Sequence, residues 1–158
     1  MPRTRGAANQ SLYRARIALE AWDQARDASR HADAQLTATF LPAVQLHLKQ
    51  AYGWFILAVS GRETADWSEL PGSTDQLAAP DAGKSVPPEL REFALLESEG
   101  WLKDMLAPWK EPDARSPMSA PEQLLTSDRS LPGFALAKQW VQRLNTLMDR
   151  MDDSLAEC

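Results

Sequence analysis

The sequence predicts an all-α protein, a bundle of four main helices with two long Pro-rich connections. Apolar residues recur at spacings of three and four in four separate stretches, which is typical of amphipathic helices. No stretch alternates between apolar and polar residues, as a half-buried strand would. A chain of 158 residues is about one domain. We therefore expect a single helical domain over residues 1–158, with residues 1–8 disordered.

The first helix is expected from Asn9 to His31, with Asn9 as its N-cap. Its apolar stripe consists of Leu12, Ala15, Leu19 and Trp22. The charged residues of this stretch fall largely off the stripe, as expected for a helix that buries one face.

The second helix is expected from Ala34 to Ser60, and Gly61 is a suitable C-terminal stop. Its stripe consists of Phe40, Val44, Leu48, Ala51 and Phe55, with His47 at the edge. Pro42 either lies in the first turn of a helix that starts near Thr39, or kinks a longer helix. We favour the longer, kinked helix.

The end of this helix is apolar on every side, from Ala51 to Val59. Nine residues are too few to cross a bilayer, which requires about 20, so we predict no membrane span. A helix that is apolar all round must be covered on more than one face. It is either the central helix of the domain or part of a contact with a second subunit. We expect a homodimer, with Trp54, Phe55 and Ile56 at the interface.

A first connection, rich in Pro, Gly, Ser and Asp, covers residues 61–87, and "STDQLAA" within it can form one helical turn. Pro88 is a favourable first residue for a third helix. Gly100 predicts a break near Ser98 to Gly100, followed by a short helical continuation, "WLKDML".

A second Pro-rich connection covers residues 107–133, and a last helix follows it to the end of the chain. The apolar residues of this helix keep a regular spacing of three and four: Leu136, Trp140, Leu144, Leu147, Met151 and Leu155.

The sequence contains no phosphate-binding loop, dinucleotide fingerprint or nucleophile elbow. A Glu-x-x-His metal motif would need glutamate three residues before His31 or His47, where Ala28 and Val44 stand. The single cysteine, Cys158, is the last residue and has no histidine close to it in sequence. We therefore predict no catalytic residue, no cofactor and no metal.

One pair of residues supports an alternative. The stretch "RDASRH" sets Arg26 shortly before His31, which resembles the arginine–histidine motif of the HEPN ribonucleases, a family of all-helical dimers. The resemblance implies that His31 would assist proton transfer and Arg26 would hold a phosphate. A third hypothesis is a small-ligand pocket near Trp54 and His47.

Composition bounds the partners and the compartment. The sequence pI is about 5.0, and non-specific nucleic-acid binding normally needs a basic surface, so a nucleic-acid partner is not expected. The start, "MPRTRGAANQ", lacks the apolar core of a secretory signal, and one cysteine cannot form an intramolecular disulfide. We expect a cytoplasmic protein.

The layout resembles a family of short proteobacterial proteins of unknown function. The resemblance rests on "SLYRARIALEAW", "LHLKQAYGWFILAVSG", "PPELREFALLESEGWL" and a terminal "SLAEC", in that order. Members of that family tend to end in Glu-Trp, where this chain ends in Glu157 and Cys158. The resemblance implies an all-helical fold and a bacterial cytoplasm, and it implies no activity.

The function is unknown from sequence alone. The interpretation we favour is a non-enzymatic helical bundle that acts through protein–protein contacts, as a homodimer or with an unidentified protein partner. The alternative is a HEPN-like protein that cleaves or binds RNA through Arg26 and His31.

Overall fold

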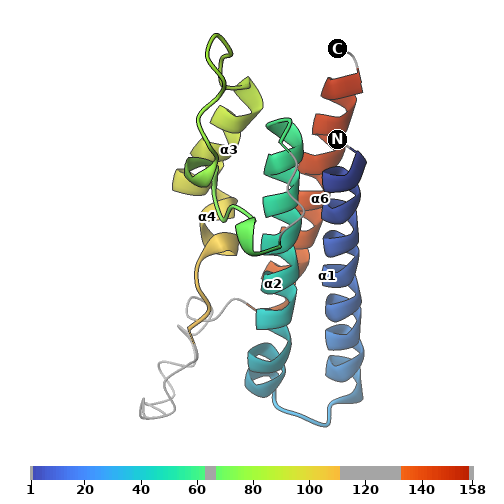
Figure 1. Ribbon diagram of the computed structural model, residues 1–158. Coiled ribbons are helices and arrows are strands. Elements are labelled where there is room, and N and C mark those ends of the chain that lie inside the picture. Colours follow the sequence, from blue (N-terminus) through green and yellow to red (C-terminus); the bar gives the residue numbers. More distant parts are fainter. Residues whose placement is uncertain (1, 63–66, 111–132, 157–158) are drawn as a thin grey trace.

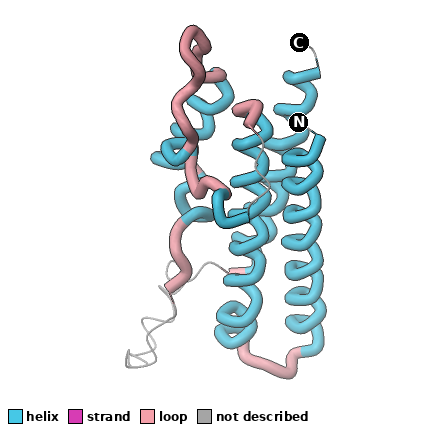
Figure 2. The backbone as a smooth tube through the Cα atoms, viewed as in Figure 1, coloured by secondary structure: helices cyan, strands magenta, loops and turns pink. Residues whose placement is uncertain are grey.

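The computed structural model describes residues 2–62, 67–110 and 133–156, and within these ranges it is helical, with no strand. Three long helices lie side by side (Figures 1 and 2). They are α1 (Pro2–Ala28), α2 (Asp33–Val59) and α6 (Phe134–Ala156). Two shorter helices, α3 (Pro88–Glu99) and α4 (Trp101–Leu106), flank α2. Two single 3-10 turns, η1 (Trp67–Glu69) and η2 (Thr74–Gln76), precede α3.

Helices α1 and α2 form an antiparallel hairpin whose connection lies at the end of the bundle opposite the N-terminus (Figure 1). Near that connection Trp22 stacks on Phe40 and meets Phe134 edge-on, with ring centroids 6.2 Å and 5.4 Å apart. These rings join α1, α2 and α6 in one apolar layer, since aromatic side chains bury large areas and favour these geometries.

Arg5 joins the same three helices at the other end. Its Nε donates to Asp152 Oδ1 at 2.8 Å and its Nη1 donates to Asn9 Oδ1 at 2.7 Å. Its guanidinium also lies over the Phe55 ring, 5.5 Å from the centroid. Because Arg5 meets the end of α6 while Trp22 meets its start, α6 runs antiparallel to α1.

Side chains on α2 hold the shorter elements. The Gln45 amide donates to the carbonyls of Met105 and Ala107, both at 3.0 Å, and so binds the last turn of α4. The Met105 carbonyl has no partner within α4, because the last carbonyls of any helix lack one.

The start of the first helix differs from the prediction. The expected N-cap at Asn9 is wrong, because α1 begins at Pro2, and residues 2–8, which were expected to be disordered, are helical. Thr4 and Ala8 are buried there, at 1% and 0% exposure. Small side chains make this contact with the bundle, so no large apolar residue marked it in the sequence. The helix ends at Ala28, before His31.

The other helices agree with the sequence analysis. Helix α2 contains Pro42 in its interior, which confirms the longer of the two alternatives. The break at Gly100 and the short helix after it are confirmed, and so is the last helix. The turn predicted in "STDQLAA" is the 3-10 turn η2. Of the second Pro-rich connection, residues 111–132 lie outside the described ranges.

Candidate interaction surface

The apolar end of α2 lies in the core. Every residue from Ala51 to Ala58 is buried, and the three residues predicted at an interface, Trp54, Phe55 and Ile56, are 5%, 1% and 0% exposed. The sequence allowed two interpretations of this run, as part of the central helix of the domain or as a contact with a second subunit. The structure agrees with the central helix.

Each side of the run is covered by an element of the same chain. Phe93 of α3 packs against Phe55 and Tyr52, at centroid distances of 5.5 Å and 6.4 Å. Arg5 of α1 covers the Phe55 ring from another side. The connection after α2 approaches so closely that a Cβ built on Gly53 would lie 2.8 Å from the Pro71 carbonyl oxygen. The hypothesis that a second subunit must cover Trp54 therefore loses its basis.

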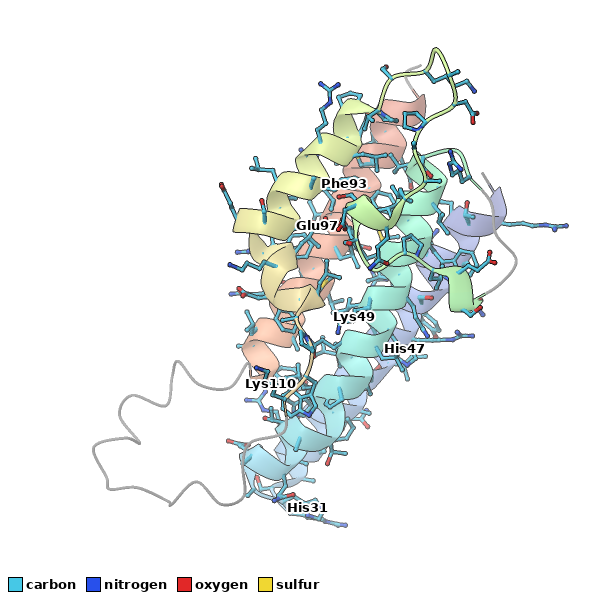
Figure 3. The ribbon with its side chains drawn as sticks, turned by 60° about the vertical axis from the view of Figure 1, so that its left-hand side comes forward. His31, His47, Lys49, Phe93, Glu97 and Lys110 are labelled. Atoms are coloured by element: carbon cyan, nitrogen blue, oxygen red, sulfur yellow. The ribbon has the colours of Figure 1, made fainter. Side chains whose placement is uncertain are left out.

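A half-buried carboxylate, that of Glu97, joins the elements that cover the run. Tyr52 donates its hydroxyl to Glu97 Oε1 at 2.5 Å, and Thr74 donates from its backbone N–H and its hydroxyl to the two oxygens of Glu97, at 2.9 Å and 2.8 Å. Glu97 thus holds α2, α3 and η2 together. Burial, with the hydrogen bond to Glu97 and the charge of Glu97 as further causes, raises the pKa of Tyr52 well above its usual range. Figure 3 shows Glu97 beside Phe93, between α3 and this connection.

The large apolar side chains that are exposed lie outside this run: Tyr13, Ile17, Leu46, Val86 and Leu95. Tyr13 and Ile17 on α1 are 61% and 49% exposed, one helical turn apart on the face of α1 that points away from the bundle. Helix α1 stands at the edge of the bundle, so no other described element covers this face (Figure 1). The sequence analysis missed both residues because they fall off the stripe that it used to define the helix. Their own spacing of four was the signal available.

A row of exposed residues, at alternating spacings of three and four, runs the length of α1. We call this row the outer face of α1. Its members are Arg3, Gly6, Gln10, Tyr13, Ile17, Glu20, Gln24 and Asp27, and each of them is exposed. Among the described residues, Arg3, Glu20 and Asp27 have no hydrogen-bond or ion-pair partner. The face is therefore apolar at its centre, basic at one end and acidic at the other.

Of the pair predicted for RNA cleavage, Arg26 lies in the last turn of α1 and His31 in the connection that follows. Arg26 is committed to local contacts, since its guanidinium lies 4.3 Å from the centroid of the Phe134 ring and 3.7 Å from an oxygen of Asp23. His31 is exposed in the connection between α1 and α2, at the tip of the hairpin (Figure 3).

His47 is half-buried on α2, and its Nδ1 is enclosed without a hydrogen-bond partner among the described residues. A groove of about 740 Å³ lies away from His47 and Trp54, between the end of α2, residues 74–87 and the start of α3. Its walls combine apolar side chains such as Leu77 and Leu90 with charged ones. The charged lining residues are three cations and two carboxylates: Arg62, Lys84, Arg91, Asp75 and Asp81. The groove is a separate candidate for a ligand.

The described residues contain neither a metal-binding cluster nor a helix that could span a membrane. Within those ranges, no three His, Cys, Asp or Glu side chains come together in a way that could hold a metal ion. None of the described helices combines the length and the hydropathy that a bilayer crossing requires.

Comparison with known proteins indicates no activity for this chain. No curated protein and no solved structure matches the chain. One family model matches it over residues 1–158, and its description is a family of unknown function, DUF6586. The match agrees with the resemblance to an uncharacterised family that the layout of the sequence indicated. The chain belongs to this family of unknown function.

Proposed function

We propose that the protein is a non-enzymatic interaction module whose protein–protein contacts are made by the outer face of α1. The exposure of Tyr13 and Ile17 is the observation that carries the proposal. A tyrosine and a β-branched residue one turn apart form the kind of apolar centre that is found in protein interfaces, where aromatic residues are enriched.

The surroundings of this centre support the same function. The face has a polar and charged rim, with Arg3 toward one end and Asp27 toward the other. Protein interfaces commonly combine an apolar centre with a charged rim that sets the partner and its orientation. Single exposed apolar residues are ordinary on protein surfaces, whereas two of them side by side within a charged rim are typical of a contact surface.

Site-specific photo-crosslinking tests the proposal. A photoreactive phenylalanine analogue replaces Tyr13, or Leu95 as a matched control, because Leu95 is a comparably exposed apolar residue (58%) on α3. Cells that express each version are irradiated, and adducts are resolved by mass. We expect a discrete adduct from position 13 that disappears when Ile17→Gln is added, and none of comparable yield from position 95. No adduct from position 13, or equal adducts from both positions, would overturn the proposal.

The resemblance to proteobacterial proteins and the single cysteine favour a bacterial cytoplasm for this activity. The RNA-cleaving alternative stays a prediction, and the described contacts of Arg26 with Phe134 and Asp23 lend it no support.

A second candidate function is the binding of a small anionic molecule in the groove beside α3. Its volume of about 740 Å³ falls in the usual range of ligand pockets. Arg91 lines it and has no hydrogen-bond or ion-pair partner among the described residues. Native mass spectrometry of the purified protein tests this. We expect a retained adduct that Arg91→Ala removes, and an adduct-free spectrum would argue against this candidate.

A further inference from the structure

We propose that the partner of the outer face is a second copy of this chain, with the two α1 helices packed antiparallel across a two-fold axis between Tyr13 and Ile17. The inference rests on the proposed function, and it adds the identity, direction and register of the partner.

The spacing of the face fits a helix–helix seam. Alternation of three and four is the pattern by which one helix packs along another over several turns. From Arg3 to Asp27 the seam is about 36 Å long, at ~1.5 Å of rise per residue. Gly6 lies within it, and a Cβ at Gly6 would meet nothing within 4 Å in the single chain.

The charges fix the direction. With the axis between Tyr13 and Ile17, each Tyr13 meets the Ile17 of the partner, and each Arg3 meets the partner's Asp27. The same register sets Gln10 opposite the partner's Glu20 and Gly6 opposite the partner's Gln24. Every position of the face then has a compatible neighbour, and each contact occurs twice, as a two-fold interface requires. A parallel arrangement would set Arg3 against Arg3 and Asp27 against Asp27.

The helix dipole favours the same arrangement. Helix α1 has no acidic residue in its first turn, and Arg3 lies near its positive end while Asp27 lies near its negative end. Both charges are unfavourable for the isolated helix, because the N-terminus attracts anions and the C-terminus attracts cations. An antiparallel partner brings Asp27 to the N-terminus and Arg3 to the C-terminus. This complementarity of α1 with itself is the reason for choosing a second copy over an unrelated protein.

Charge reversal tests the register. The full chain, Arg3→Glu, Asp27→Arg, and an equimolar mixture of the two variants are compared by sedimentation equilibrium, from about 1 µM to about 1 mM, the range of transient associations. We expect the wild type to self-associate. Each variant alone places like charges opposite each other twice and weakens association about tenfold. In the mixed dimer, Glu at position 3 of one chain meets Arg at position 27 of the other, and the second pair is the wild-type Asp27 with the wild-type Arg3. Both pairs then join opposite charges, so the heterodimer regains the wild-type affinity.

Each result decides between named possibilities. Weakening in both variants and rescue in the mixture support the antiparallel dimer. A wild type that stays monomeric, or variants that associate as well as the wild type, overturn it. If the wild type stays monomeric while the probe at position 13 still yields an adduct with a different protein, the proposed function stands and only self-pairing falls. If there is neither self-association nor an adduct, both fall.

Discussion

The two longest helices, α1 and α2, are each 27 residues long and pack against each other, yet they differ in how they bury their apolar side chains. Helix α2 carries an apolar run that is buried on all sides over Ala51 to Ala58. Helix α1 is the more polar of the two and is the one that leaves Tyr13 and Ile17 exposed. An unbroken apolar run in this chain therefore marks the core. The candidate contact surface consists of two apolar residues on an otherwise polar face.

The reason for the difference is the number of neighbours. Around the end of α2 stand α1, α3, α6 and the connection that contains Pro71, and together they cover every direction. Helix α1 lies at the edge of the bundle and has neighbours on one side (Figure 1). Position in the bundle, more than the hydropathy of the helix, decides which apolar side chains stay available.

The largest expected difference between the helices is the cost of removing an apolar side chain. Phe55→Ala opens a cavity in the core and should lower the free energy of unfolding by about 3–5 kcal/mol. Ile17→Ala removes an exposed side chain and should change it by less than about 0.5 kcal/mol. Urea unfolding, followed by circular dichroism at low protein concentration, measures both. Equal losses would contradict the assignment of core and surface.

The two tyrosines give the next difference. Tyr52→Phe removes a hydrogen bond to Glu97 and should cost about 1–2 kcal/mol at neutral pH, while Tyr13→Phe should cost almost nothing.

The same pair predicts a pH dependence. The unfolded chain releases the phenol proton of Tyr52 above about pH 10, while the folded chain retains it because its pKa is raised. The stability associated with this proton is therefore complete below pH 10 and is lost as the pH rises further. As the pH rises above 10, the melting temperature should fall less steeply for Tyr52→Phe than for the wild type or Tyr13→Phe. Equal slopes of melting temperature against pH for all three proteins would contradict this role of Tyr52.

Two helical glycines give the smallest single effects, and these have opposite signs. Gly6→Ala, in open space on α1, should stabilise the protein by about 0.5–1 kcal/mol, because alanine is the better helix former. Gly53→Ala has the same intrinsic gain, but its Cβ would meet the Pro71 carbonyl oxygen, so we expect a net loss of about 1 kcal/mol. Chemical denaturation of both variants measures the signs. A stabilising Gly53→Ala would mean that the connection does not press on α2.

Much of the fold was predictable from regular spacing. The stripe of α6 and the long α2 follow from apolar residues every three or four positions, and Gly100 marked the break after α3. The first turns of α1 were not predictable, because their buried residues include Thr4 and Ala8, which carry no strong hydropathy. The approach of the chain to Gly53 was missed because the connection that contains Pro71 is predicted as a loop. Gly53, inside an apolar helix, was the one sign that another backbone comes close.

The central claim is that contacts are made by the outer face of α1 and not by the apolar run of α2. Sedimentation equilibrium of Ile17→Gln tests it most directly, with Leu95→Gln as a control for removing an exposed apolar residue from α3. We predict that the wild type and Leu95→Gln approach twice the 17.6 kDa of one chain as the concentration rises, while Ile17→Gln stays at the mass of one chain. Association of Ile17→Gln that equals that of the wild type would contradict the claim.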